Sequence, residues 1–254
     1  MKVLIVTVAG CSTRFSRSVG EETIKCLYFQ NSFEESLLYR IFHQPFEFDR
    51  YIIVGGYRYE ELKTTVESRF PEYKKRMVFV ENPYFKEYGS GYSLFYGIKE
   101  AQKLCADEVV FAEGDLFLDS ETFVDICTSK KSVVSLNRDP ILANKAVAFY
   151  FNKNNTIRYI YDTGHDTLFI NEPFISIYNS GQVWKFTDKK VVDRICTGMT
   201  NFDWQGTNLV FVERYFNTLA QDDFRLVCFK EWINCNTVDD FINSLRKGKQ
   251  IENN

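Results

Sequence analysis

The chain of 254 residues is long enough for one large α/β domain or two small ones, and its 45% hydrophobic and 26% charged content is that of a globular protein. The net charge of −3 argues against a general nucleic-acid binder. The seven Cys form no CxxC pair and no cluster with His, so we expect reduced thiols in a cytoplasmic protein. No apolar run approaches a membrane span and the chain starts directly in a strand-like run, so we expect neither a membrane segment nor a cleaved signal peptide.

The first half of the sequence alternates strand-like and helix-like patterns. Apolar, β-branched runs predict strands at 3–8, 51–54, 77–80 and 109–112. Amphipathic spacing predicts helices at 33–42, 59–70 and 93–104. A capping box, Ser32-x-x-Glu35, marks the start of the first of these helices. This alternation favours a parallel or mixed sheet that is covered by helices.

The second half begins with closely spaced strands. They are predicted at 132–137, 146–151, 157–161 and 173–177, and residues 152–156 (NKNNT) indicate a hairpin turn. Helices at 188–195 and 209–219, a last strand at 224–233 and a closing helix from Thr237 follow. No linker or repeat divides the chain, so we expect one domain over 1–247 and a polar tail over 248–254.

The loop after the first strand is suited to binding phosphate. The strand breaks at Gly10, and Cys11, Ser12 and Thr13 lead to Arg14, with Lys25 further on. Loop N–H groups can aim at phosphate oxygens while Arg and Lys neutralise their charge. The spacing matches neither the P-loop nor the dinucleotide-binding fingerprint. We therefore favour phosphate binding for Arg14 and Lys25 over the alternative that both are ordinary surface cations.

Asp115 follows the predicted strand at 109–112, and ligands of open α/β sheets bind at that edge. A single Asp there suits Mg²⁺, which takes one or two carboxylates plus substrate oxygens in phosphate sites. The alternative is a helix N-cap. Asn236 lies between the last strand and the closing helix, where its carbonyl oxygen could ligate the metal opposite Asp115 or simply cap the helix.

The segment 82–93 (NPYFKEYGSGYS) is rich in Gly, Ser and aromatic residues just before a predicted helix. Its backbone groups and hydroxyls could read the edge of a pyrimidine, with Tyr88, Gly89, Ser90 and Ser93 as the contacting residues. The alternative is an ordinary turn in which the small residues only start the helix.

Four blocks in this order resemble the nucleotidyltransferases that join a nucleoside triphosphate to a phosphorylated acceptor. The first is GCSTR at 10–14 followed by Lys25, and the second is IIVGGYRYEEL at 52–62. The third is ENPYFKEYGSGYSLFYGI at 81–98, and the fourth combines Asp115 with WINCNTVDDF at 232–241. The resemblance covers nearly the whole chain and is strongest up to about residue 120 and again near the end.

Three positions depart from the family pattern. Ser12 replaces the second loop glycine, Ile24 stands where a proline usually precedes the Lys, and Asn236 stands where many members have Asp. The Tyr92-Ser93-Leu94 helix start makes the chain most similar to small bacterial cytidylyltransferases that resemble the choline-phosphate enzyme.

The resemblance implies a three-layer α/β/α fold with a Rossmann-like, mostly parallel mixed sheet of the nucleotide-diphospho-sugar transferase type. It implies a Mg²⁺-dependent cytidylyltransferase of the cytoplasm that transfers CMP from CTP to a small phosphorylated or phosphonate acceptor, for polysaccharide or phospholipid precursors. Residues 1–120 would bind the nucleotide and 121–247 the acceptor. Arg14 would stabilise the leaving pyrophosphate and Lys25 the α-phosphate. Backbone groups of Ala9, Gly10, Cys11, Ser12 and Thr13 would hold phosphates, and Asp115 and Asn236 the Mg²⁺.

The acceptor site is less defined by the sequence. Arg138 or Lys145 could meet the acceptor phosphate. Tyr178, Trp184 and Trp204 could cage a quaternary ammonium group, although a chain with 24 Phe and 15 Tyr also needs aromatic residues for its core. We expect no nucleic-acid or membrane partner, and either a monomer or a homodimer.

Three other functions stay open. A sugar-1-phosphate nucleotidylyltransferase using CTP, UTP or dTTP shares the same blocks. The second is a GT-A type glycosyltransferase, because Glu113-Gly114-Asp115 resembles the D-x-D metal motif of those enzymes. Such an enzyme does not bind a triphosphate, however, and so would not need the cations Arg14 and Lys25. A non-catalytic nucleotide-binding regulator would not need both Lys25 and Asp115.

Overall fold

A nine-stranded mixed sheet forms the centre of the computed structural model, which describes residues 1–143, 147–161 and 166–252. Its strands are β1 (Lys2–Thr7), β2 (Arg50–Gly55), β3 (Met77–Glu81), β4 (Glu108–Glu113), β6 (Ser132–Asn137), β7 (Ala148–Asn152), β8 (Ile157–Ile160), β9 (Phe174–Phe186) and β10 (Phe224–Cys228). The main path has the order β10-β6-β9-β4-β1-β2-β3. Only β9 on this path is antiparallel to its neighbours, so the other six strands share one direction.

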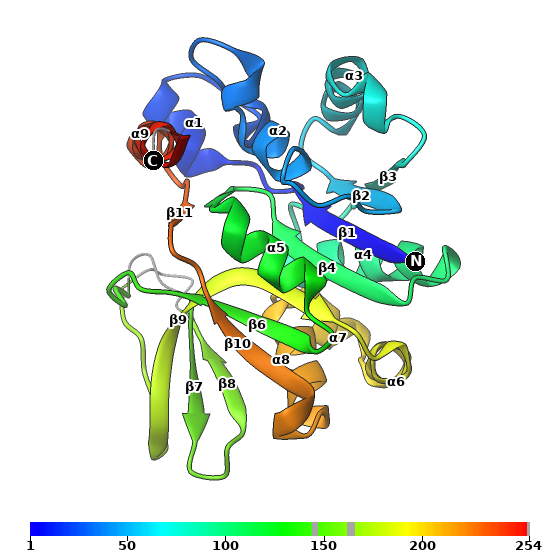
Figure 1. The fold of residues 1–254 in the computed structure, drawn as a ribbon, viewed down its shortest axis with the longest axis vertical. Coiled ribbons are helices and arrows are strands. Elements are labelled where there is room, and N and C mark those ends of the chain that lie inside the picture. The colour runs from blue at the N-terminus through cyan, green and yellow to red at the C-terminus, as the bar shows by residue number, and fades with distance from the viewer. Residues whose placement is uncertain (144–146, 162–165, 253–254) are drawn as a thin grey trace.

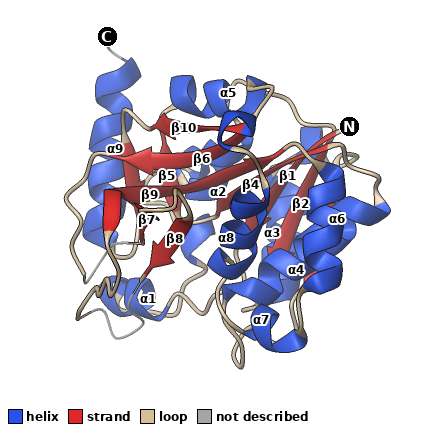
Figure 2. Cartoon of the chain, turned by 90° about the horizontal axis from the view of Figure 1, so that it is seen from below, coloured by secondary structure: helices blue, strands red, loops and turns tan. Residues whose placement is uncertain are grey.

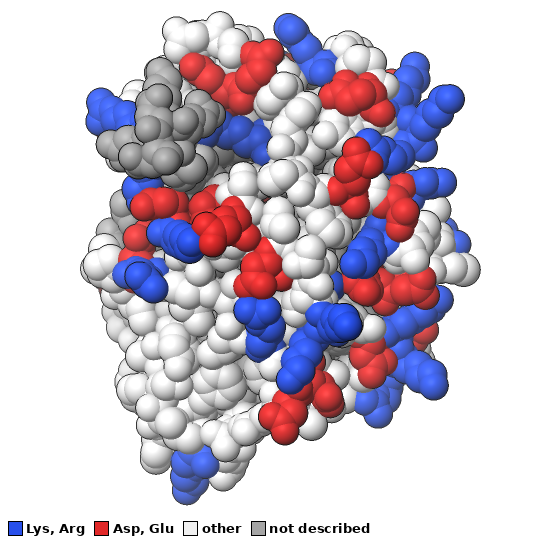
Figure 3. Space-filling view, viewed as in Figure 1, with Lys and Arg blue, Asp and Glu red and all other residues white. Residues whose placement is uncertain are grey.

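Two groups of strands lie off the main path. The first half of β9 pairs with β7, which pairs with β8, and this three-stranded extension projects from the lower end of the molecule (Figure 1). The part of its surface seen in Figure 3 carries few charged side chains. The strands β5 (Leu116–Leu118) and β11 (Trp232–Asn234) form a separate two-stranded sheet.

Helices cover both faces of the central sheet (Figure 2). They are α1 (Thr13–Val19), α2 (Leu37–Phe42), α3 (Tyr59–Arg69), α4 (Ser90–Lys103), α5 (Ser120–Thr128), α6 (Lys189–Gly198), α7 (Asn201–Gln205), α8 (Leu209–Thr218) and α9 (Val238–Glu252). Short 3₁₀ turns lie at Lys25–Leu27, Phe33–Glu35, Pro71–Tyr73 and Gln221–Asp223.

The side chains of β1 show how the two faces are built. Leu4 and Val6 pack into a core with α2, α3 and α5, whereas Val3 and Ile5 pack into a second core with α4, α6, α7 and α8. Successive strand residues point to opposite faces, and all four of these side chains are fully buried. The apolar run that predicts this strand therefore serves two hydrophobic layers, as expected of a covered parallel sheet.

A third apolar cluster ties the C-terminus to the start of the chain. Phe15 of α1 packs edge-on against Phe241 of α9, with ring centroids 6.4 Å apart, and Phe117 of β5 and Cys235 join them. The two helices lie side by side in Figure 1. This contact brings the segments around Arg14 and Asn236 together, although they are far apart in the sequence.

The fold class is confirmed: the protein is a three-layer α/β/α structure with a mixed, mostly parallel sheet. Several predicted boundaries were wrong. The strand predicted at 173–177 continues to Phe186 as β9, and the helix predicted from residue 93 begins at Ser90. Two further differences have a visible cause. Helix α2 begins at Leu37, because Ser36 accepts the Tyr39 N–H and acts as its cap, while Glu35 instead accepts the backbone N–H groups of residues 30 and 31. The single strand predicted at 224–233 is two strands, since β10 pairs with β6 and β11 leaves the main sheet to pair with β5.

Helix α9 continues to Glu252 and so enters the segment that was expected to be a tail. Among the described residues, no helix has both the length and the apolar character needed to cross a bilayer.

Candidate active site

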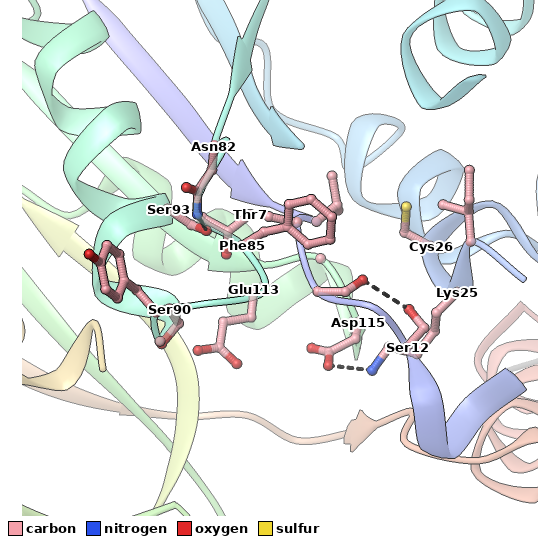
Figure 4. Close-up of a pocket in the computed structure, with 17 residues that line it drawn as sticks. Thr7, Ser12, Lys25, Cys26, Asn82, Phe85, Ser90, Ser93, Glu113 and Asp115 are labelled. Atoms are coloured by element: carbon pink, nitrogen blue, oxygen red, sulfur yellow. Dashed lines mark hydrogen bonds and ion pairs between the residues drawn. The ribbon is translucent and has the colours of Figure 1, made fainter. Parts of the chain in front are cut away.

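A cavity of about 370 Å³ opens at the carboxyl ends of β1, β3 and β4. Residues 7–10 and 113–115 line it side by side, because Thr7 pairs with Glu113 in the parallel ladder. The remaining lining residues are Ser12, Ile24, Lys25, Cys26, Asn82, Phe85, Tyr88, Gly89, Ser90 and Ser93. Open α/β sheets bind ligands at this edge, which makes the cavity the candidate active site (Figure 4).

The loop after β1 turns sharply into α1. Ser12 precedes the helix in a left-handed backbone conformation, with φ 54° and ψ 31°. Non-glycine residues rarely adopt this conformation, because the Cβ atom crowds the following carbonyl oxygen. Ser12 therefore holds, at an energetic cost, a conformation that glycine adopts readily.

Lys25 and Asp115 face each other in the cavity. The Lys25 Nζ lies 2.6 Å from the Asp115 Oδ2, and the two side chains are only 14% and 22% exposed. The other carboxylate oxygen of Asp115, Oδ1, is buried and has no hydrogen-bond partner among the described residues. An oxygen of this kind is costly to bury, which indicates that a ligand completes the site.

Asn236 comes from the C-terminal part of the chain and lies next to the segment of Asp115, outside the cavity lining. The Cys235 N–H donates to the Asp115 carbonyl oxygen at 2.9 Å, which anchors the segment, and the Asn236 Oδ1 accepts from the Arg14 Nη2 at 3.1 Å. Arg14, Lys25, Asp115 and Asn236 therefore gather from four separate segments.

These residues fit a Mg²⁺ ion. No group of three His, Cys, Asp or Glu side chains suited to a metal exists in the described part of the chain. Mg²⁺ in phosphate sites does not need one, since it takes one or two carboxylates and completes its shell with water and phosphate oxygens. The unpartnered Asp115 Oδ1 provides the hard oxygen ligand that such a site requires.

The opposite end of the cavity is formed by the loop that enters α4. Gly89 and Gly91 donate their N–H groups to the carbonyl oxygens of Gln205 and Gly206, at 2.8 and 3.0 Å. A Cβ atom at Gly89 would lie 2.4 Å from the Gly206 oxygen, so this close approach requires glycine. The Asn82 Nδ2 donates to the Ser93 Oγ at 3.0 Å and fixes the other side of the loop.

Glu113 lies between these two ends. Its Oε1 accepts from the Asn208 Nδ2 at 2.8 Å, and Asn208 is 1% exposed. Burial and, to a smaller degree, the neighbouring charge of Asp115 raise the pKa of Glu113 to about 7, while Asn208 and Lys25 act in the opposite direction. Burial also raises the pKa of the Cys26 thiol to about 12, so this cavity residue is not a thiolate nucleophile at neutral pH.

A family model described as a domain of unknown function, DUF6564, matches residues 21–247. The chain belongs to this family. The match runs from before α2 into α9 and includes Lys25, Asp115 and Asn236, while the loop at 10–14 lies before its start. No curated protein matches the chain.

Solved structures with the same fold as this DUF6564 protein include several nucleotidyltransferases. The inositol-1-phosphate CTP transferase from T. maritima is 14% identical, with a TM-score of 0.66, over 94% of this chain and 91% of that one. A putative glucose-1-phosphate thymidylyltransferase from Bacillus anthracis is 13% identical, with a TM-score of 0.68, over 96% and 94%. A nucleoside-diphosphate-sugar pyrophosphorylase from Vibrio cholerae RC9 is 16% identical, with a TM-score of 0.62, over 97% and 100%. At these identities the likeness establishes the fold.

Most of the residues predicted for the nucleotide line the cavity of this DUF6564 protein. They are Ala9, Gly10, Ser12, Lys25, Tyr88, Gly89, Ser90, Ser93 and Asp115. Cys11, Thr13, Arg14 and Asn236 do not line it, although Arg14 and Asn236 bond to each other. Sequence reasoning gave no role in the nucleotide site to Thr7, Ile24, Phe85 or Glu113, and it considered Glu113 only as part of a glycosyltransferase-like motif with Asp115.

The aromatic cage predicted for the acceptor was wrong. Trp184 is fully buried, its ring stacks on Phe111, and its indole N–H donates to the Tyr159 hydroxyl. Trp204 is 3% exposed and packs in the same core. Neither ring has a free face for a cation, because both fill the layer between the sheet and its helices.

The other acceptor predictions gain no support. Tyr178 packs on Phe149, with ring centroids 5.4 Å apart, and neither it nor the exposed Arg138 lines the cavity. Lys145 lies outside the described residues.

Proposed function

We propose that this DUF6564 protein is a Mg²⁺-dependent nucleotidyltransferase that transfers CMP from CTP to a small phosphorylated or phosphonate acceptor and releases pyrophosphate. The observation that carries the proposal is the 2.6 Å pair of Lys25 and Asp115 in a cavity that also holds the strand-end loop and the glycine-rich entry to α4. One end thus offers a cation, a carboxylate and loop N–H groups for phosphates, and the other offers backbone and hydroxyl groups for a base.

In the proposed reaction an acceptor phosphate oxygen attacks the α-phosphorus of CTP, and the bond to the pyrophosphate oxygen breaks. Little covalent chemistry is asked of the protein, so its contributions are positioning and stabilisation of charge. Lys25 would exchange its contact with Asp115 for the α-phosphate oxygens, and Arg14 would turn from Asn236 to the departing pyrophosphate. Mg²⁺ held by Asp115, with Asn236 as a second oxygen donor, would supply neutralisation of phosphate charge.

The base assignment rests on the resemblance of the chain to cytidylyltransferases. The fixed loop at Gly89 and the buried Asn82–Ser93 pair leave polar groups beside the cavity that suit the edge of a base. CTP is therefore the first substrate to test, and UTP and dTTP are the comparisons.

A second candidate acceptor is a sugar or polyol phosphate. The burial of Trp184 and Trp204 favours it, because it removes two of the three rings that would have caged a quaternary ammonium group. Hydroxylated acceptors need hydrogen-bonding groups rather than aromatic faces. This candidate is also consistent with two structural neighbours, whose names give inositol 1-phosphate and glucose 1-phosphate as their acceptors.

The test is pyrophosphate release from CTP and Mg²⁺ with a panel that contains phosphocholine, an aminoalkylphosphonate, inositol 1-phosphate and glucose 1-phosphate. Lys25→Ala and Asp115→Ala should each lower turnover by about 10²- to 10³-fold, because each removes a group that stabilises charge in the transition state. Lys103→Ala is the matched control, because this lysine lies on the exposed end of α4 with its side chain 72% exposed. Near-normal turnover in both site variants, with unfolding temperatures unchanged, would contradict the proposal.

A further inference from the structure

Glu113 has a contact and a position that the proposed chemistry at the phosphates does not use. It ends β4 and projects into the cavity beside Asp115, between Asp115 and Ser90 (Figure 4). Its Oε1 is occupied by the Asn208 amide, and its Oε2 accepts no hydrogen bond from any described residue. The Glu113 side chain therefore presents one oxygen that no described residue contacts by a hydrogen bond to whatever fills the middle of the cavity.

The support of Glu113 is rigid and is shared with the loop that enters α4. Asn208 precedes α8, is almost completely buried, and donates its side chain to Glu113 at 2.8 Å. Its backbone N–H donates to the Ser90 Oγ at 3.1 Å. Glu113 and the proposed base-binding loop are thus attached to the same buried residue, which fixes their relative position.

The order of groups along the cavity matches the order of parts in a nucleotide. Ser90 lies at one end, Glu113 lies in the middle, and Asp115 and Lys25 lie at the other end (Figure 4). In any nucleoside triphosphate the ribose separates the base from the α-phosphate. A ligand with its base at Ser90 and its phosphates at Lys25 therefore places its ribose against Glu113.

We infer that Glu113 accepts a hydrogen bond from a ribose hydroxyl and makes the site selective for ribonucleotides over deoxyribonucleotides. This inference rests on the proposed function and adds a specificity-determining residue to it. A carboxylate is a strong acceptor for a hydroxyl, and acidic side chains bind ribose hydroxyls in unrelated nucleotide folds. A nucleotide that lacks the hydroxyl would leave the Oε2 unsatisfied, which is the main source of discrimination at polar sites.

The experiment measures the Kd values of CTP, 2′-deoxy-CTP and 3′-deoxy-CTP with Mg²⁺ and no acceptor present. The wild type should bind CTP about tenfold or more tightly than one of the deoxy forms, as expected for a hydrogen bond to a charged group. In Glu113→Ala this ratio should fall to roughly one to threefold, with CTP weakened and the deoxy form little changed. Glu113→Gln keeps the shape and the contact with Asn208, and should give an intermediate ratio.

Ser93→Ala is the matched control, because it removes a cavity hydroxyl that accepts from the Asn82 Nδ2 and bonds to neither Asn208 nor Glu113. It should weaken CTP and both deoxy forms by the same factor and leave the ratio at its wild-type value. Unfolding temperatures of all variants without ligand separate these effects from loss of the fold.

Several outcomes would overturn the inference. If Glu113→Ala weakens all three nucleotides equally, Glu113 only supports the loop. If it changes the KM of the acceptor or the Mg²⁺ requirement while the CTP to deoxy-CTP ratio stays constant, the carboxylate serves the acceptor or the metal. If CTP, UTP, ATP and GTP all fail to bind to the wild type, the proposed function itself fails and this inference falls with it.

Discussion

Gly89→Ala tests the geometry of the loop that enters α4. The new Cβ atom would lie 2.4 Å from the Gly206 oxygen, whereas ordinary contact begins at 3.4 Å, so the two backbones must separate by about 1 Å. That shift takes the 2.8 Å hydrogen bond from Gly89 to Gln205 out of range. We expect a loss of about 2 kcal/mol in stability from the lost bond and the overpacking.

The same displacement should weaken CTP binding by roughly ten- to a hundredfold, because contacts to a ligand fail when their donors move by about 1 Å. The assay is a CTP titration with Mg²⁺, together with urea unfolding of the free protein. Gly198→Ala is the matched control, since a Cβ at the end of α6 meets nothing within 4 Å. A Kd for CTP that is unchanged in Gly89→Ala would refute the role given to this loop.

Two further predictions concern stability. Ser12→Gly should raise the free energy of unfolding by about 0.5–1 kcal/mol, because relief of the left-handed strain exceeds the entropic cost of glycine. Urea unfolding measures this change, and Ser12→Ala is the control because it keeps the strained backbone conformation. A stability of the Gly variant equal to or below that of the wild type would contradict the reasoning. Lys185→Met should cost about 3 kcal/mol, because a fully buried ammonium group that pairs with Glu108 at 2.7 Å and donates to the carbonyl oxygens of Cys127 and Ser129 would be lost. Lys103→Met, an exposed control, should change stability by less than about 0.5 kcal/mol. An equal effect of both substitutions would contradict the claim that the buried contacts of Lys185 stabilise the fold.

Hydrophobic patterns and strand ends in the sequence predicted most strands of the sheet and the place of Asp115 correctly. The run at 3–8 predicts a buried strand because it is apolar at successive positions, and in the structure its successive residues alternate between two cores. Asp115 was placed correctly at the sheet edge, because a polar residue after a buried parallel strand has only that position. The capping box at Ser32 failed because Ser36 competes for the same helix start and captures the Tyr39 N–H.

The rest depended on contacts between distant segments. Nothing near Glu113 in the sequence reveals that Asn208 binds it, since the two residues meet only when α8 packs on the sheet. Trp184 and Trp204 were wrongly assigned to the acceptor site, because the sequence does not distinguish an aromatic side chain in a binding site from one in a core. Their burial follows from the layers that α4, α7 and α8 build with the sheet.

Thermal unfolding with Mg²⁺ and CTP, UTP, dTTP, ATP, GTP or UDP-glucose tests the central claim that the cavity binds a nucleoside triphosphate with a divalent metal. At about a hundred times its Kd, CTP should stabilise the protein by roughly 2.7 kcal/mol. In a chain of this size that is a shift of a few degrees. A selective shift with CTP that disappears on chelation of Mg²⁺, and in Asp115→Ala, is the predicted result. A shift with UDP-glucose and none with any triphosphate would contradict the account and favour a glycosyltransferase.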